Sequence, residues 1–283
     1  MRFHASTYLT LGVLAVCAGA WAVGPGGEGG NGNQDSQSCL VRPDTDAPDD
    51  NAKGNVRIRS KGNGNSERFD VHVQKVEAGV EHHLFLEDPL DSDTFVDLGD
   101  LPGDGGSQKL ALDTKKGDEL PLMDQGVLTT EDLIGRRIEV RKGDDVELEG
   151  VVPPYGLEKK NQKVKIEVDA DEDDPQPDIT GTLEMRSKEN KGQERIILTL
   201  KKVDFDDGPF DVFVEDAVGS GVFVNVGDLD QKSEHKGKYK RDCKKGQALP
   251  TGVMFVSDLG GRLIQVRDDA DVVFLETTIP SLD

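Results

Sequence analysis

Apolar and polar residues alternate in short runs along most of the chain, which is the pattern of β-strands with one buried face. In one such run, Phe69, Val71 and Val73 fall on one face, and Asp70 and His72 fall on the other. Glycine, asparagine and proline separate the runs at short intervals, and no stretch sustains a helical period. The alternation therefore predicts an all-β protein.

The alternating runs occur twice, in the same order. The first series begins at Gly54 and ends at Pro153, and the second begins at Gly181 and ends at Pro280, so both ends are offset by 127 residues. The offset drifts by a residue or two in between, always at a turn, where insertions are tolerated. We interpret the two series as a tandem duplication.

Each copy has about seven short strands in about 100 residues, which predicts two tandem antiparallel β-sandwiches of immunoglobulin-like size, with a small barrel as the alternative. The predicted organisation is a signal peptide over 1–22, a flexible N-terminal segment over 23–53, a first β repeat over 54–153, an acidic linker with a short strand over 154–180, and a second β repeat over 181–283. Because Cys39, Leu40 and Val41 lie one repeat before the linker strand, an extra strand before Gly54 is a further prediction.

A glycine-containing turn is the most similar segment of the two copies. Asp132, Gly135 and Arg136 of the first copy correspond to Asp258, Gly261 and Arg262 of the second. The glycines suit a positive φ, and each arginine is expected to pair with the aspartate carboxylate before it. A capping-box pattern from Thr129 to Asp132 also predicts one helical turn. We interpret this segment as a corner that sets strand register, with anion binding by the arginines as the alternative.

The N-terminus has the pattern of an export signal. A basic start at Arg2 precedes a mostly apolar run over residues 8–20, and Ala20 and Ala22 are small residues where a signal peptidase cuts. Cleavage after Ala22 is expected, with lipid attachment at Cys17 as an alternative. No later segment reaches transmembrane length. We expect an exported protein that is extracellular, periplasmic or at the cell surface.

Acidic residues dominate the composition and give a formal net charge of −21. Removal of residues 1–22 takes away one base, Arg2, and no acid, so the mature charge is −22. Such a charge disfavours nucleic acid and anionic membranes as partners. Most phenylalanines lie in alternating runs and are assigned to the core, which weakens a carbohydrate site that depends on aromatic stacking.

Metal binding has two candidate sets of ligands. Asp88, Asp91, Asp93 and Asp97 form an Asp-rich loop whose carboxylates suit calcium, although an Asp-rich turn in so acidic a protein is usually just solvated. The three histidines His72, His82 and His83 form a second set, for a transition metal, if adjacent strands bring them together.

Lysines concentrate in one strand of the second copy, where Lys236, Lys238 and Lys240 share a face. A lysine-lined edge strand that prevents aggregation explains this pattern. The alternative is a docking surface for an acidic partner, such as segment 169–174 of a second molecule. Two cysteines follow the signal, Cys39 and Cys243; a disulfide between them and two separate thiols both remain open.

Catalytic motifs do not emerge from the sequence. Neither a metalloprotease HExxH motif nor a phosphate-binding glycine loop is present, and no carboxylate pair is distinguished from the many others. We therefore expect a non-catalytic binding or structural module without a cofactor other than the calcium above. Its partner is expected to be a protein, an extracellular polymer or a second copy of the chain. The alternative is a small secreted hydrolase, supported by calcium.

Overall fold

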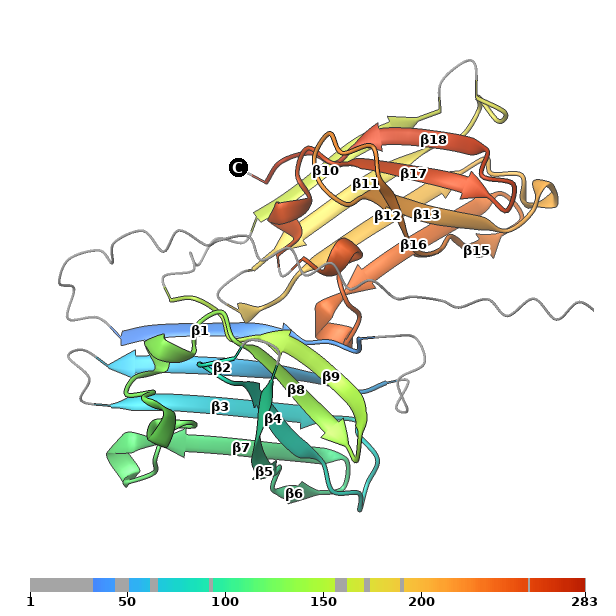
Figure 1. The fold of residues 1–283 in the computed structure, drawn as a ribbon. Helices are drawn as coiled ribbons and strands as arrows, with labels where there is room; N and C mark the ends of the chain where they lie inside the picture. Colours follow the sequence, from blue (N-terminus) through green and yellow to red (C-terminus); the bar gives the residue numbers. More distant parts are fainter. Residues whose placement is uncertain are drawn as a thin grey trace, which may run out of the picture. The chain divides into compact units, whose positions relative to one another are not determined.

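The strands of the computed structural model follow the alternating runs of the sequence (Figure 1). The structure describes residues 33–43, 51–61, 66–91, 94–155, 162–170, 174–188, 191–253 and 255–282. Within these ranges the named strands pair only in antiparallel fashion, they form four sheets, and no α-helix occurs. The prediction of an all-β protein is confirmed.

The first repeat contains a five-stranded sheet and a four-stranded sheet. Their strand orders are β1-β2-β3-β7-β6 and β5-β4-β8-β9. The strands are β1 (Asn33–Leu40), β2 (Lys53–Lys61), β3 (Glu67–Gln74), β4 (His83–Glu87), β5 (Phe95–Asp100), β6 (Gly103–Asp104), β7 (Ser107–Asp113), β8 (Arg137–Lys142) and β9 (Asp145–Val151).

The second repeat has the same topology, strand for strand. Its sheets have the orders β10-β11-β12-β16-β15 and β14-β13-β17-β18. The strands are β10 (Gln162–Asp169), β11 (Thr180–Ser187), β12 (Arg195–Lys201), β13 (Phe210–Glu215), β14 (Phe223–Asp228), β15 (Asp230–Ser233), β16 (Lys236–Asp242), β17 (Leu263–Asp268) and β18 (Val273–Thr278). The duplication in the sequence thus extends to the order of the strands.

Short 3-10 helices occupy several of the connections. They are η1 (Thr114–Lys116), η2 (Met123–Gln125), η3 (Thr130–Leu133), η5 (Phe205–Asp207), η6 (Cys243–Lys245), η7 (Pro250–Gly252) and η8 (Val256–Leu259). At η3 the Asp132 carboxylate accepts the Thr129 backbone N–H at 2.9 Å, as a capping box requires. The helical turn predicted at this position is therefore confirmed.

The two sheets of each repeat pack face to face around an apolar core. In the first repeat Phe69 of β3 is buried in one cluster with Leu84 of β4 and Ile138 of β8. In the second repeat Leu198 of β12 and Val212 of β13 share a cluster in the same way. Each such side chain contributes about 1.5–3 kcal/mol by burial. This packing is that of a β-sandwich, and the described strands form no closed barrel.

One strand precedes the predicted start of each repeat. β1 lies inside the segment that was expected to be flexible, and β10 lies in the linker, where alternation predicted a strand. β1 pairs along its full length with β2, with Cys39 opposite Asn55. The extra strand predicted around Cys39, Leu40 and Val41 is present, and it begins earlier, at Asn33.

The repeated turn closes the four-stranded sheet of each copy. Gly135 and Gly261 both have a φ of 81°, which favours glycine. The Nε of Arg136 donates to the backbone oxygen of Asp132 at 2.9 Å, and Arg262 contacts the backbone oxygen of Asp258 at 3.2 Å. The expected arginine–carboxylate pairs are thus replaced by arginine–carbonyl bonds, because the aspartate carboxylates face the preceding backbone N–H groups instead.

Among the residues described, no helix has the length and apolar character needed to cross a bilayer.

Candidate functional site

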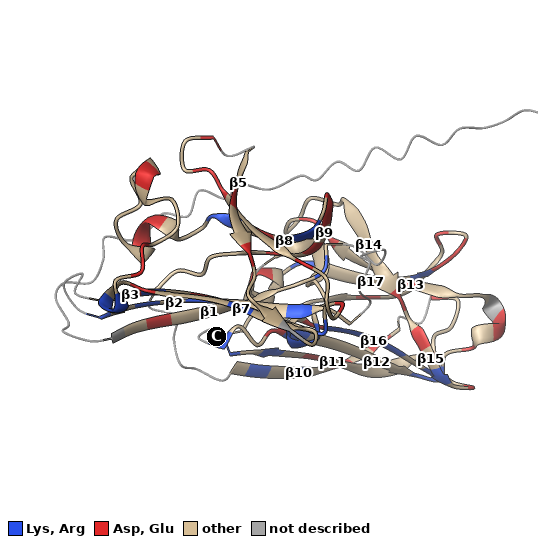
Figure 2. Ribbon diagram, turned by 90° about the horizontal axis from the view of Figure 1, so that it is seen from below, with Lys and Arg blue, Asp and Glu red and all other residues tan. Residues whose placement is uncertain are grey.

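Lys and Arg residues recur along the strands of the second five-stranded sheet (Figure 2), and the burial pattern of these strands places most of them on its outer face. Along β16, Gly237 and Tyr239 are buried inward, so Lys236, Lys238 and Lys240 point to the outer face. The cationic residues of this face are Lys163, Lys165, Arg186, Arg195, Lys201, Lys232, Lys236, Lys238 and Lys240, and its carboxylates are Glu167, Asp169, Glu184, Asp230 and Asp242. Cations therefore outnumber carboxylates here, in contrast to the chain as a whole.

The lysine-rich strand is not an edge strand, which corrects one of the two interpretations of its lysines. β16 lies between β12 and the short strand β15. The long exposed edge of this sheet is β10, where Lys163 and Lys165 are exposed. Protection against edge-to-edge pairing can therefore be assigned to these two lysines. The docking role of Lys236, Lys238 and Lys240 stays a prediction.

The outer face of the first five-stranded sheet is also basic. Its cationic residues are Lys53, Arg57, Arg59, Lys61, Arg68 and Lys109, and its carboxylates are Asp35, Asp70 and Asp113. Asp35 is placed between Arg57 and Arg59, and its hydrogen bond with Arg57 holds its pKa below the usual value. One carboxylate thus neutralises only part of two neighbouring guanidinium charges.

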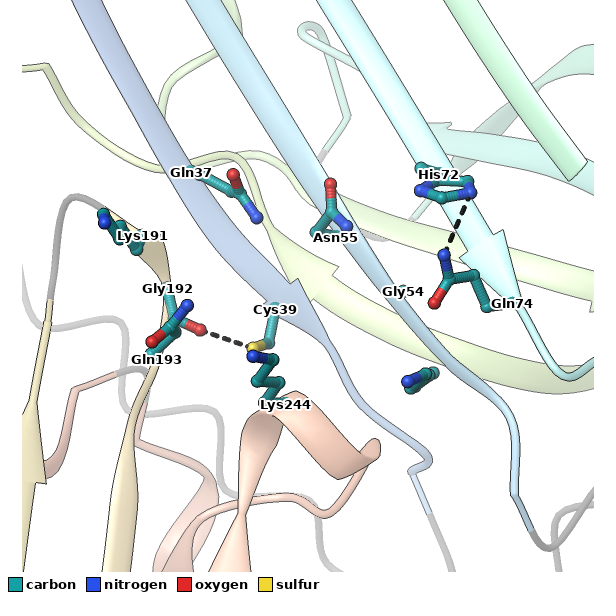
Figure 3. Close-up of a pocket in the computed structure, with 11 residues that line it drawn as sticks. Gln37, Cys39, Gly54, Asn55, His72, Gln74, Lys191, Gly192, Gln193 and Lys244 are labelled. Atoms are coloured by element: carbon teal, nitrogen blue, oxygen red, sulfur yellow. Dashed lines mark hydrogen bonds between the residues drawn. The ribbon is translucent and has the colours of Figure 1, made fainter. Parts of the chain in front are cut away.

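A pocket of about 120 Å³ opens at one end of this face, beside a turn of the second repeat (Figure 3). Strands β1, β2 and β3 supply one wall, and the segment 191–193 together with η6 supplies the other. The described lining residues are Gln37, Cys39, Lys53, Gly54, Asn55, His72, Gln74, Lys191, Gly192, Gln193 and Lys244. None of them is an aspartate or glutamate, although the chain carries a net charge of −21.

The chemistry of the lining is that of hydrogen-bond donors. Lys53, Lys191 and Lys244 carry ammonium groups, and none of them has an ion-pair partner among the described carboxylates. Burial, followed by the charges of Lys109 and Lys53, lowers the pKa of His72, which favours the neutral form of its ring. Amides of glutamine and asparagine both donate and accept. An anionic group in this pocket would meet three lysines and, among the described lining residues, no competing carboxylate.

A second cluster surrounds His83 on the outer face of the first four-stranded sheet. The His83 Nδ1 lies 3.1 Å from the Asp97 carboxylate, and the His83 Nε2 lies 3.0 Å from the Asp100 carboxylate. Glu81 is close enough that a hydrogen bond to Asp100 raises the pKa of Glu81. Among the described residues, Glu81, His83 and Asp100 are the group whose ligand atoms could reach one metal ion. Glu81 and Asp100 are both exposed, so a solvated cluster explains them as well.

The predicted calcium ligands are divided between different contacts. Asp97 lies in β5 and faces His83, whereas Asp88 accepts the backbone N–H of Leu90 at 2.7 Å. Asp91 accepts a hydrogen bond from Thr94 through its backbone oxygen. Asp93 lies outside the described residues. The calcium site stays a prediction.

The three histidines proposed as a metal set do not share one surface. His72 belongs to β3 of the five-stranded sheet and lies 3.1 Å from the Ser107 hydroxyl. His82 is buried with its Nδ1 3.2 Å from the Val80 oxygen, and the adjacent His83 faces outward to Asp97. The four-stranded and five-stranded sheets thus separate His83 from His72.

Both repeats carry a stack of two phenylalanines and an arginine that the sequence interpretation missed. The guanidinium of Arg141 lies 4.2 Å from the ring centre of Phe85 and 5.4 Å from that of Phe95. In the second repeat Arg267 stacks in the same way on Phe213 and Phe223, at 4.4 and 5.0 Å. These four phenylalanines lie on the outer face, whereas Phe69, Phe210 and Phe274 belong to the cores. The alternation along the strand was the available signal. Phe85 lies between Leu84 and Leu86, which are buried, so its side chain points to the opposite, outer face.

Comparison with known proteins provides no family for the chain. No family model matches it, and no curated protein matches its sequence. Among solved structures, Candida albicans superoxide dismutase 5 in its copper(II) form is 18% identical, with a TM-score of 0.29, over 44% of this chain and 94% of that chain. A mutant of the same enzyme is also 18% identical, with a TM-score of 0.27, over 44% of this chain and 93% of that chain. Similarity this weak carries no inference about function.

Proposed function

We propose that the protein is an exported, non-catalytic binding module that holds acidic groups of an extracellular polysaccharide. The observation that carries the proposal is the pocket of Lys53, Lys191 and Lys244, which contains no described carboxylate in a chain of net charge −21. Three ammonium groups that line one cavity, without an ion-pair partner among the described carboxylates, favour a carboxylate or sulfate ligand. The amide groups beside them suit the hydroxyls of a sugar, which both donate and accept hydrogen bonds.

The neighbouring strand supports a polymer rather than a single small anion. β2 leads from Lys53 in the pocket to Arg57, Arg59 and Lys61 on the same outer face. Alternate residues of a strand are about 6.8 Å apart, so Arg57, Arg59 and Lys61 follow one another at this spacing, with Asn55 between them and Lys53. A chain with an acidic group on successive sugar units could occupy the pocket and this row together. Binding would then not depend on an aromatic platform.

Binding fits the lining better than hydrolysis does. Among the described residues, the Cys39 sulfur contacts the Cys243 sulfur and the Gly192 oxygen, and it has no hydrogen bond to a base that would activate it for attack. His72 contacts Gln74 and Ser107 and no described carboxylate orients it. A nucleophile, a base and an orienting group are therefore not assembled among the described lining residues. The hydrolase alternative has no specific support in this pocket.

Calorimetric titration with polygalacturonate or a sulfated polysaccharide tests the proposal. The triple variant Lys53→Gln, Lys191→Gln and Lys244→Gln should weaken binding at least tenfold, and binding should weaken as salt rises. The matched control is Lys115→Gln, Lys116→Gln and Lys201→Gln, which removes the same charge outside the pocket and should bind normally.

Three outcomes would overturn the proposal. They are the absence of binding to any acidic polysaccharide, equal losses in the pocket and control variants, and tighter binding of polyaspartate than of the sugars. The last result would assign the pocket to an acidic protein segment.

A further inference from the structure

The two cysteines that follow the expected signal meet in the structure, although 204 residues separate them. Cys39 is near the end of β1 in the first repeat, and Cys243 begins η6, directly after β16 of the second repeat. Their Sγ atoms are 2.6 Å apart, which is closer than two non-bonded sulfur atoms pack. No other cysteine is present beyond residue 22.

Backbone contacts that do not involve sulfur hold each cysteine in place. On one side, β1 is fixed by its full register with β2, and the N–H of Arg42 donates to the oxygen of Gly246 at 2.9 Å. On the other side, the N–H of Cys243 donates to the oxygen of Glu194 at 3.1 Å. The approach of the two sulfur atoms is thus determined by two independent sets of hydrogen bonds.

The turn at Gly192 completes this arrangement. The Gly192 oxygen lies 2.6 Å from the Cys39 sulfur and 3.0 Å from the Cys243 sulfur. The residue has a φ of 51°, and a Cβ at this position would lie 2.7 Å from the Cα of Ser38. Glycine therefore allows the turn to approach β1 closely enough to cover both sulfur atoms.

We propose that Cys39 and Cys243 form a disulfide that fastens the first strand of one repeat to the second repeat. A low-molecular-weight disulfide such as oxidised glutathione is the oxidant. One cysteine sulfur attacks it and releases one glutathione thiol, and the second cysteine sulfur then displaces the other glutathione. The protein thiols lose two protons and two electrons, which reduce the oxidant to two thiols.

The bond has a consequence for the pocket described above. Cys39 is part of the pocket wall, and Lys244 of the opposite wall directly follows Cys243. A disulfide would hold these walls together and would preorganise the lysine group. This consequence rests on the proposed function, whereas the existence of the bond does not.

Mass spectrometry of the full chain tests the bond. In every form Cys17 is replaced by Ser, so that only the two cysteines of interest remain. The folded protein is equilibrated with oxidised glutathione and then alkylated with iodoacetamide under denaturing conditions. We expect no alkylation, a mass lower by two hydrogen atoms, and a proteolytic peptide pair that joins Cys39 to Cys243.

The single variants Cys39→Ser and Cys243→Ser are the controls. Each retains one sulfur, so it should become alkylated, carry one glutathione or dimerise through the remaining cysteine. The proposal is overturned if the protein with both cysteines behaves like these variants, with two alkylated thiols, separate glutathione adducts or intermolecular dimers. Failure of polysaccharide binding would leave this result untouched.

Discussion

At the scale of single residues, Asp132 and Asp258 occupy equivalent turns in opposite electrostatic surroundings. Burial acts to raise the pKa of Asp132, but hydrogen bonds from Thr129 and Leu128 outweigh it, so the pKa lies below its usual value of 3.8. Burial raises the pKa of Asp258, and its hydrogen bond from the Phe255 N–H is long, at 3.4 Å. Ionisation of Asp132 is therefore favoured by folding, whereas ionisation of Asp258 is opposed.

The variants Asp132→Asn and Asp258→Asn should consequently differ in thermal melting. A carboxyl whose pKa falls on folding adds stability above its unfolded pKa, and this stability is lost as the pH falls through the folded pKa. A carboxyl whose pKa rises on folding, such as Asp258, adds stability below its unfolded pKa, and this stability is lost as the pH rises through the folded pKa. At neutral pH Asp132→Asn should lower the Tm and Asp258→Asn should not, and the deficit of Asp132→Asn should shrink toward about pH 3. Equal changes at neutral pH would contradict these assignments.

Side-chain partners were only partly predictable from residue order. The capping box at Thr129 and Asp132 is local, so its spacing was sufficient to predict it. The contact between His83 and Asp97 joins two strands and depends on their register, which alternation does not determine. The sequence interpretation for that reason assigned Asp97 to a calcium loop.

At the scale of elements, the structure has strands with weak apolar patterns as well as strong ones. β1 was assigned to a flexible segment because the residues it buries include Ser36 and Ser38, with Leu40 the first apolar one. Ser38 can be buried because its hydroxyl donates a hydrogen bond to the Val151 oxygen at 2.6 Å. Strands whose buried face is polar lack the alternation on which sequence-based prediction depends.

The stacks of phenylalanine and arginine should stabilise the four-stranded sheets. Arg141→Ala should destabilise the fold by about 1–2 kcal/mol, because two cation–π contacts are lost at a partly exposed site. Arg141→Lys keeps the charge but loses the planar stacking surface, so it should recover only part of the loss. Urea unfolding measures the free energy of unfolding of both variants. A lysine variant as stable as the natural chain would show that charge alone is important at this position.

At the scale of the whole molecule, charge is segregated rather than evenly spread. The outer faces of the two five-stranded sheets are basic in a chain of net charge −21, so the acidic residues must prevail elsewhere. The sequence revealed the lysines of β16, because they lie close together in one strand. The pocket was not predictable, because β1, β2, β3 and two turns of the other repeat each supply only one or a few of its residues.

The lysine face of β16 is expected to contact acidic surfaces of a second copy. Sedimentation velocity at low ionic strength should detect association that disappears as salt rises above physiological levels, because exposed charges are then screened. Lys236→Gln, Lys238→Gln and Lys240→Gln together should give a monomer at every salt concentration. Association that is unaffected by salt, or by this variant, would exclude these lysines.

The most direct measurement of the central claim is a crystal structure with a short oligogalacturonate or a sulfated disaccharide. We predict that one acidic group lies in the pocket within hydrogen-bond distance of Lys53, Lys191 and Lys244, with the sugar extending along β2. A ligand that leaves the pocket empty and binds elsewhere on the chain would contradict the proposed binding site.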